Sequence, residues 1–301
     1  MQKLSARRVS IRRLLAAGSV LLLLPAAYLS LRPSLLHRGA TPQEIVRPMP
    51  GDELIAHSPF YATRAITIDA KPEAIWPWFV QMGYRRAGYY GYDLIENIGA
   101  PAGIRSASTI QPELQHPKPG DLMPISGVAH LIFGPVEPNR YLIWRSEAEP
   151  ADGVFTWALV PIDAGHTRLI SRIRLRYHWN NPLKLALDGF TEFADPIAVP
   201  AILQGVRDRV EGRPIRPLWS EAIEFTIWLA ALADWFAALA GIFRQDEWLR
   251  PWLVTCACTA LVLLVFYFPP PLWIGALLVL AAAAGLIRTP RRTESPQPTP
   301  A

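Results

Sequence analysis

The sequence predicts an α+β domain held between membrane-spanning helices. Long apolar runs crowd both ends of the 301-residue chain, whereas the middle has the mixed composition of a soluble domain. In that middle part a helical pattern near residue 75 is followed by several short strand patterns and then by a second helical pattern. This order is typical of helices packed against an antiparallel sheet.

The N-terminal region, residues 1–39, begins with a basic flank and contains no acidic residue before position 39. The apolar run from Leu14 to Leu31 follows, and its 18 residues are just enough to cross a hydrocarbon core of about 30 Å. A cleaved signal peptide has a shorter apolar region of about 7 to 15 residues and ends in a small-x-small site, which this stretch lacks. We therefore expect an uncleaved anchor.

The C-terminal membrane region, residues 216–288, contains three further apolar runs. The runs 252–268 and 272–287 are separated by three prolines, which cannot continue a helix, so we expect a helical hairpin in the membrane. The run 222–243 contains two carboxylates, each of which costs about 2.5 to 3.5 kcal/mol at mid-span. It therefore either spans the membrane or lies on its surface. The tail 289–301 is rich in proline and is predicted to be disordered.

Positive charge predicts the topology of these helices. Cytoplasmic flanks carry an excess of Lys and Arg, and the basic residues before position 14 place the N-terminus in the cytoplasm. We therefore expect a multi-pass protein of the cell membrane whose soluble domain lies on the extracytoplasmic side. If 222–243 spans, both termini are cytoplasmic and the arginines that follow the C-terminal helices also lie inside. Arginines between 207 and 216 are the counter-evidence, because they would then lie outside.

Residues 40–215 form a domain of ordinary size. Alternation in residues 63–70 predicts a strand. In the next segment Pro72 suits a first helical turn, and apolar residues then recur at helical spacing. Pro77 lies within that pattern and predicts a kink or a short first turn.

Five short runs rich in β-branched and aromatic residues lie between residues 120 and 177 and predict an antiparallel meander. In the last run, apolar side chains share one face and Arg168, Arg172 and Arg174 share the other. An antiparallel sheet with one buried and one solvated face has this pattern. Residues 181–214 then read as a helix that is broken near its two internal prolines.

The stretch "RAGYYGYDLIEN" is dense in polar and aromatic groups. Tyr89, Tyr90 and Tyr92 either border a ligand cavity, with a hydroxyl that orients the ligand, or pack around a tight turn. Asp93 and Glu96 are three residues apart, so they would share one face of a helix and could act as an acid and base pair. The alternative is that Asp93 caps the helix and Glu96 reaches back to its start.

Four other residues are candidates for the wall of a ligand cavity. Trp78 lies on the first predicted helix, and Trp144 and Trp157 lie on predicted strands. His130 lies on the strand "VAHLIF", where it is either a ligand contact or a structural histidine.

No spacing typical of a metal site, phosphate loop or nucleophile elbow is present, so we expect no metal and no cofactor. The two cysteines, Cys256 and Cys258, lie in an apolar run and face different directions on a helix. The formal net charge of +5 belongs largely to the membrane flank. Because no basic patch with aromatics lies inside the soluble domain, nucleic acid is not an expected partner.

The order of motifs resembles the SRPBCC superfamily. The resemblance is carried by "PEAIWPWFVQMG", "RAGYYGYDLIEN", "RYLIW", "FTWALVP" and "TRLISRIR", and covers about residues 60–212. This is the START-like, helix-grip group that includes polyketide cyclases and dehydrases and lipid-transfer proteins. The upstream segment "GATPQEIVRPMPGDELI" is similar to the lead-in of membrane-tethered bacterial members. The resemblance implies a curved antiparallel sheet around a C-terminal helix, with a hydrophobic cavity between them.

The sequence therefore favours a membrane-anchored helix-grip domain that binds a hydrophobic or amphipathic small molecule, such as a lipid. Two alternatives remain open at this point. One is an enzyme of the cyclase or dehydratase type acting on a hydrophobic substrate, and the other is a membrane-tethered module that docks proteins. The fold alone does not choose between them, because it hosts binders, carriers and enzymes.

Overall fold

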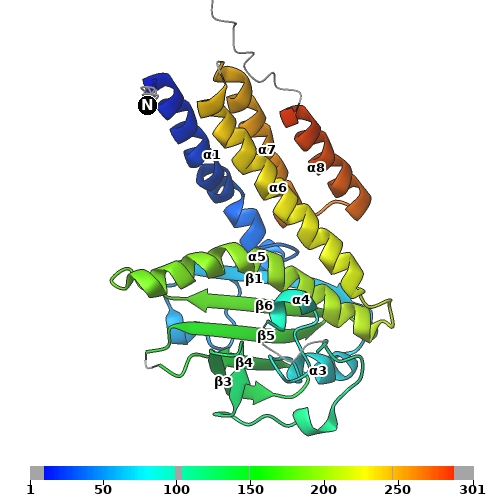
Figure 1. Ribbon diagram of the computed structural model, residues 1–301. Helices are drawn as coiled ribbons and strands as arrows, with labels where there is room; N and C mark the ends of the chain where they lie inside the picture. Colours follow the sequence, from blue (N-terminus) through cyan, green and yellow to red (C-terminus); the bar gives the residue numbers. More distant parts are fainter. Residues whose placement is uncertain (1–9, 99–103, 149, 246, 288–301) are drawn as a thin grey trace, which may run out of the picture. The chain divides into compact units, whose positions relative to one another are not determined.

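A computed structural model describes residues 10–98, 104–148, 150–245 and 247–287 (Figure 1). The chain divides into two compact units, one of residues 33–221 and one that combines residues 1–32 with residues 222–301. The predicted disordered tail lies outside the described residues. In chain order the elements are α1 (Ile11–Leu36), α2 (Pro42–Val46), the 3₁₀ helix η1 (Asp52–Ile55), β1 (Phe60–Ile68), α3 (Pro72–Val80), α4 (Asp93–Glu96), the 3₁₀ helix η2 (Pro112–Leu114), β2 (Leu122–Pro124), β3 (His130–Glu137), β4 (Tyr141–Arg145), β5 (Gly153–Pro161), β6 (Thr167–Leu175), α5 (Pro182–Val210), α6 (Leu218–Arg244), α7 (Leu249–Tyr267) and α8 (Leu272–Ile287).

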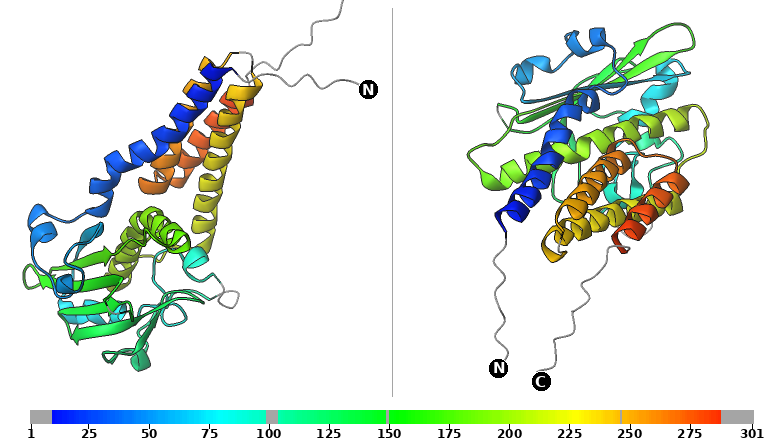
Figure 2. Two further views of the ribbon diagram at one scale, coloured as in Figure 1. Left: turned by 90° about the vertical axis from the view of Figure 1, so that its left-hand side faces the viewer. Right: turned by 90° about the horizontal axis from the view of Figure 1, so that it is seen from above.

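The central unit is a six-stranded antiparallel sheet with helices α3 and α5 on one face. The strand order is β1-β6-β5-β4-β3-β2, so the first and last strands in the sequence are neighbours. A register shift between Phe133 and Val136 bends β3. Figure 1 shows α5 running along β1, the strand it contacts, and Figure 2 shows it from two other directions. The α+β class and the sheet curved around a C-terminal helix are confirmed.

The core of this unit lies between the sheet and the two helices, and we call this side of the sheet the inner face. Side chains of all six strands alternate into it and meet apolar residues of α3 and α5. Its buried members from the two helices are Ile75, Trp76, Phe79, Val80, Val199, Ile202, Leu203 and Val206. Helix α3 begins at Pro72 as expected and accommodates Pro77 inside a nine-residue helix.

The opposite, outer face of the sheet is covered by residues 37–58, which we call the strap. Met49 of the strap packs against Ala65 and Ile170 of the sheet. The expectation that the arginine face of the last strand is solvated is therefore wrong. Arg172 is only 1% exposed, and a buried guanidinium needs charge and hydrogen-bond partners. The strap supplies them.

Two carboxylates of the strap pair with three arginines of β6. Asp52 binds both Arg172 and Arg174 at 2.8 Å, and Glu44 binds Arg168 at 2.8 Å. Arg172 also donates to the strap carbonyls of Glu44, Ile45 and Arg47. Glu44 and Thr41 form a capping box that holds α2 in place. The strap is therefore an integral layer of the domain.

Three of the described helices, α1, α6 and α7, are long and apolar enough to cross a membrane. Helix α6 is continuous through residues 222–243, and its Trp228 and Trp235 donate to Val265 and Thr259 of α7. Helix α8 has 16 residues, which at 1.5 Å per residue is about 24 Å and less than the thickness of a hydrocarbon core. Its transmembrane span stays a prediction.

We expect Arg172→Met to lower the free energy of unfolding by about 3 kcal/mol, because removal of one partner of a buried ion pair leaves the other unpaired or underpaired. Denaturant unfolding of the full-length protein in detergent, followed by tryptophan fluorescence, measures this. The matched control is Arg140→Met, since Arg140 pairs with Glu137 but its side chain is 72% exposed. We expect the control to change stability by less than about 1 kcal/mol. Equal effects would mean that the strap does not stabilise the domain through Arg172.

Candidate functional site

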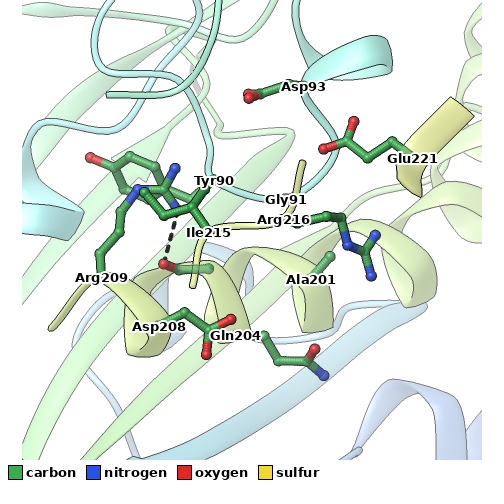
Figure 3. Close-up of a pocket in the computed structure, with 11 residues that line it drawn as sticks. Tyr90, Gly91, Asp93, Ala201, Gln204, Asp208, Arg209, Ile215, Arg216 and Glu221 are labelled. Atoms are coloured by element: carbon green, nitrogen blue, oxygen red, sulfur yellow. Dashed lines mark hydrogen bonds between the residues drawn. The ribbon is translucent and has the colours of Figure 1, made fainter. Parts of the chain in front are cut away.

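The segment 83–97 meets helix α5 at a small surface pocket (Figure 3). Its volume is about 90 Å³. Figure 3 shows Tyr90 and Arg209 together on one side, with Asp93 and Glu221 on the other. Ligand pockets for drug-sized molecules measure about 300–1,000 Å³. The pocket therefore has room for a few water molecules and none for a lipid.

Tyr90 forms the tightest contact between this segment and α5. Its φ is +71°, a left-handed conformation that is costly for a tyrosine. A Cβ on Gly205 of α5 would lie 2.0 Å from the carbonyl oxygen of Tyr90, so only glycine permits this approach. The strained backbone of Tyr90 is thus held against Gly205 of α5.

The side chain of Tyr90 is also fully engaged. Its hydroxyl accepts from Gln81 at 2.8 Å and donates to the carbonyl of Trp78 at 2.9 Å. The Arg209 guanidinium lies 4.2 Å from the ring centroid, a cation–π contact. Burial raises the pKa of the Tyr90 hydroxyl well above its usual range, so it stays protonated. Tyr90 thus connects the segment 83–97 to both α3 and α5.

The carboxylates after Tyr92 hold the backbone around α4. The N-cap of α4 is Tyr92, so the hypothesis that Asp93 is the cap is wrong. Asp93 instead accepts from the backbone N–H and the hydroxyl of Ser106, at 2.9 and 2.6 Å. The N–H of Leu94 in the first turn of α4 donates to Glu221, which is 127 residues further along the chain. Glu96 does reach back, but it accepts from the N–H of Gly91 at 3.2 Å, before the N-cap, so the expected capping box with Asp93 is not formed.

Glu96 is the most perturbed carboxyl group of this region. Burial raises its pKa to about 8, although hydrogen bonds from the N–H groups of Tyr92 and Gly91 oppose the shift. Its second oxygen, Oε1, is buried and has no hydrogen-bond partner among the described residues. Glu96 is therefore largely protonated at neutral pH.

A second group of polar atoms lies on the inner face of the sheet, which the core otherwise fills with apolar side chains. Ser171 of β6 stands opposite Arg64 of β1 on one side and Trp157 of β5 on the other. Trp144 of β4 adjoins Trp157, with ring centroids 5.4 Å apart. All four side chains are at most 3% exposed. We call these residues the inner polar row.

Each member of the inner polar row has a buried polar atom that makes no hydrogen bond within the described part of the chain. These atoms are Arg64 Nη1, Trp144 Nε1, Trp157 Nε1 and Ser171 Oγ. A buried polar atom without a partner costs about 1 to 3 kcal/mol, and native structures contain few. The alignment of such atoms on one face therefore needs an explanation.

Arg64 connects the inner polar row to α5. Its Nη2 lies 2.6 Å from Oδ2 of Asp195, and both side chains are buried. Its Nε donates to the carbonyl of Leu35 at 3.0 Å. Asp195 stands directly before Pro196, one of two prolines inside α5. The ion pair thus fixes α5 against β1 at the point where a proline interrupts its hydrogen bonding.

The structure does not bring the aromatic candidate residues together at one place. Trp144 and Trp157 are brought together on the inner face. Trp78 and Tyr90 are 6.2 Å apart between centroids, and the hydroxyl of Tyr89 donates to the carbonyl of Pro124. The Tyr92 ring is covered by the Arg216 guanidinium at 4.9 Å.

His130 lies apart from these groups. Its side chain is 48% exposed and 3.5 Å from Glu147, and its neighbour Leu131 is the residue that points into the core. Within the described residues no group of three or more His, Cys, Asp or Glu side chains is placed to hold a metal ion. The ligand-contact role of His130 stays a prediction that the geometry does not favour.

Sequence reasoning missed Arg64, Ser171 and Asp195. A signal for Arg64 was present, because in "TRAITIDA" it has the same parity as Ile66 and Ile68, which mark the inner face. An arginine at an apolar-parity position of a strand indicates a buried charge with a partner.

Comparisons with known proteins give structural similarity alone. No family model and no curated protein matches the chain. A polyketide-cyclase-like protein from Corynebacterium glutamicum is 14% identical, with 50% of this chain and 91% of that chain covered and a TM-score of 0.32. The self-sacrificing resistance protein CalC from Micromonospora echinospora is 14% identical, with 52% and 97% covered and a TM-score of 0.32. A protein from Mesorhizobium loti is 18% identical, with 50% and 98% covered and a TM-score of 0.29. Similarity at this level carries no argument about activity.

We expect Glu96→Gln to change the pH dependence of stability. A carboxyl whose pKa rises from 4.5 to about 8 on folding destabilises the folded state progressively as pH rises through that interval, at up to about 1.4 kcal/mol per pH unit. The variant lacks this loss, so its stability relative to wild type should increase from pH 5 to pH 8 and level off above. Thermal unfolding of the full-length protein across this range measures it.

The control for this experiment is Glu113→Gln, because Glu113 is exposed in η2. Its unfolding profile should run parallel to that of wild type. Parallel profiles for Glu96→Gln as well would show that Glu96 ionises at its ordinary pKa in the folded protein.

Proposed function

We propose that this protein is a membrane-anchored domain that binds a hydrophobic or amphipathic small molecule, such as a lipid, between the inner face of the sheet and α5. The observation that carries the proposal is the inner polar row, whose buried polar atoms have no hydrogen-bond partner among the described residues. A ligand in contact with the row would supply the missing partners. The surrounding apolar side chains would contact the rest of the ligand.

The chemistry of the inner polar row specifies what the polar end of the ligand would be. A guanidinium N–H and two indole N–H groups only donate hydrogen bonds, whereas the Ser171 hydroxyl can donate and accept. Three donors on one apolar face fit a carbonyl, carboxylate or phosphate oxygen. Strands in a sheet are about 4.8 Å apart, so the donors of neighbouring strands are close enough to share one polar head.

Space for the ligand would come from movement of α5. The pocket beside Tyr90 has only about 90 Å³, and the inner polar row is covered by packed side chains. Pro196 and Pro200 deprive α5 of two backbone N–H donors, so the helix has weak points beside the Arg64–Asp195 pair. Binding would lift this part of α5 from β1.

Membrane anchoring through α1 and through the C-terminal helices belongs to the same proposal, with the ligand-binding domain on the extracytoplasmic side. Three helices long and apolar enough to cross a membrane support the anchoring. The basic flank before α1 supports the orientation.

The test of ligand binding starts from the full-length protein in lipid nanodiscs. Solvent extraction followed by mass spectrometry should find an apolar or amphipathic compound enriched over empty nanodiscs. We then expect Ser171→Ala to retain less of this compound, with affinity reduced up to about tenfold for one lost hydrogen bond. Its thermal stability should stay equal or rise, because the removed hydroxyl has no partner among the described residues.

The matched control is Ser108→Ala, since Ser108 is an exposed serine outside the strands of the sheet. It should retain the compound as wild type does. If no compound is enriched, the binding proposal fails and a protein-docking role becomes the better reading. If Ser171→Ala lowers stability and retention together, the row is structural.

The test of orientation is a reporter that is active on only one side of the membrane, fused after residue 215. We expect no cytoplasmic activity, because the basic N-terminal flank keeps the start of α1 in the cytoplasm. A fusion at the N-terminus should give the opposite result. Cytoplasmic activity after residue 215 would reverse the proposed orientation and leave the ligand-binding proposal intact.

A further inference from the structure

In the first half of α5, large apolar side chains face outward and acidic side chains face the domain, the reverse of the usual arrangement. Leu183, Leu187 and Phe190 are 73%, 59% and 63% exposed. They lie at positions i, i+4 and i+7 and therefore form one stripe along the helix. We call them the outer stripe. A surface helix of a soluble domain normally turns such a stripe toward the core.

The side of the same half-helix that faces the domain is acidic, and each of its carboxylates has a hydrogen-bond or ion-pair partner in the domain. Asp188 accepts from the backbone N–H of His178 at 2.8 Å and pairs with its ring at 3.1 Å. Glu192 accepts from the hydroxyl of Tyr177, and Asp195 pairs with Arg64 at 2.6 Å. These three contacts fix the rotation of the helix about its axis. The outer stripe cannot turn inward without breaking all of them.

The residues beside the outer stripe suit a membrane surface. Trp179 precedes the helix and is 73% exposed, and tryptophan concentrates at the boundary between water and lipid. Lys184 follows Leu183, and its side chain is 53% exposed although its ammonium lies 3.9 Å from Asp152. An exposed lysine at this position suits contact with anionic headgroups. The domain is also connected to apolar helices on both sides, since α1 ends at Leu36 and α6 begins at Leu218.

We propose that the outer stripe of α5 inserts into the surface of the bilayer that anchors the protein. Helices of this kind lie in the plane of the membrane with their apolar face about 5–10 Å into the boundary between headgroups and acyl chains. Trp179 and Lys184 contact the headgroup region at the start of the helix. The anchors hold the domain at the membrane, and the outer stripe fixes which side of it faces the lipid. This inference rests on the membrane anchoring proposed above, but it does not depend on a ligand at the inner polar row.

The test uses the full-length chain with Cys256→Ala and Cys258→Ala, reconstituted into phosphatidylethanolamine–phosphatidylglycerol liposomes. A spin label is attached through Phe190→Cys, and in a second protein through Val128→Cys. Val128 is 98% exposed in the turn between β2 and β3, at the sheet edge remote from β1 and therefore from α5. Accessibility to oxygen, which partitions into lipid, is compared with accessibility to a water-soluble nickel complex.

We expect the ratio of oxygen to nickel accessibility to be severalfold higher at position 190 than at position 128. Equal ratios would place the outer stripe in water and overturn the proposal. Low accessibility to both reagents at position 190 would mean that protein covers the stripe, either a second copy or the chain's own helices, and would also overturn it. If the Phe190→Cys protein does not fold, a spin label attached through Leu183→Cys tests the outer stripe at its N-terminal end.

Discussion

The ion pair between Arg64 and Asp195 is the constraint on which the inner side of the domain depends. It joins the edge strand β1 to α5, and both charges are buried. A buried pair contributes little net stability, but loss of one partner is costly, so the pair acts mainly by excluding other positions of the helix. With α5 in this position Gly205 lies against Tyr90 and Phe190 is exposed, and the contacts of Asp188 and Glu192 hold the same rotation of the helix.

The strap solves the corresponding problem on the outer side of the sheet. The three arginines of β6 on that face would be expected to face solvent. Instead the strap covers them, and Glu44, Asp52 and several strap carbonyls accept their hydrogen bonds. Both faces of the sheet are therefore covered, although the alternation of apolar and polar residues in β6 predicts one solvated face. Because the strap directly follows α1 in the chain, it also forms the connection between the first apolar helix and the domain.

Local periodicity predicted the elements that local sequence determines. Pro72 at the start of α3, the alternation of β6 and the helical pattern of α5 are all read from neighbours within a few residues. The expected break of α5 near Pro196 and Pro200 is wrong, because α5 is one helix from Pro182 to Val210. Contacts between segments that are distant in the sequence could not be predicted from local periodicity. The N–H of Leu94 is satisfied by Glu221, and the burial of Arg172 depends on a carboxylate 120 residues earlier. Nothing in the periodicity of β6 distinguishes an arginine facing water from one facing the strap.

The position of β1 has a consequence for the synthesis of the chain. β1 lies at an edge of the sheet, and its neighbour there is β6. About 100 residues separate the end of β1 from the start of β6, which at 5–20 residues per second takes roughly 5 to 20 s to translate. During that interval the strap and β1 have been made but have no sheet to pair with. Pairings of such high sequence separation are slow to form, so the first strand stays unpaired during this interval and is open to pairing with other chains.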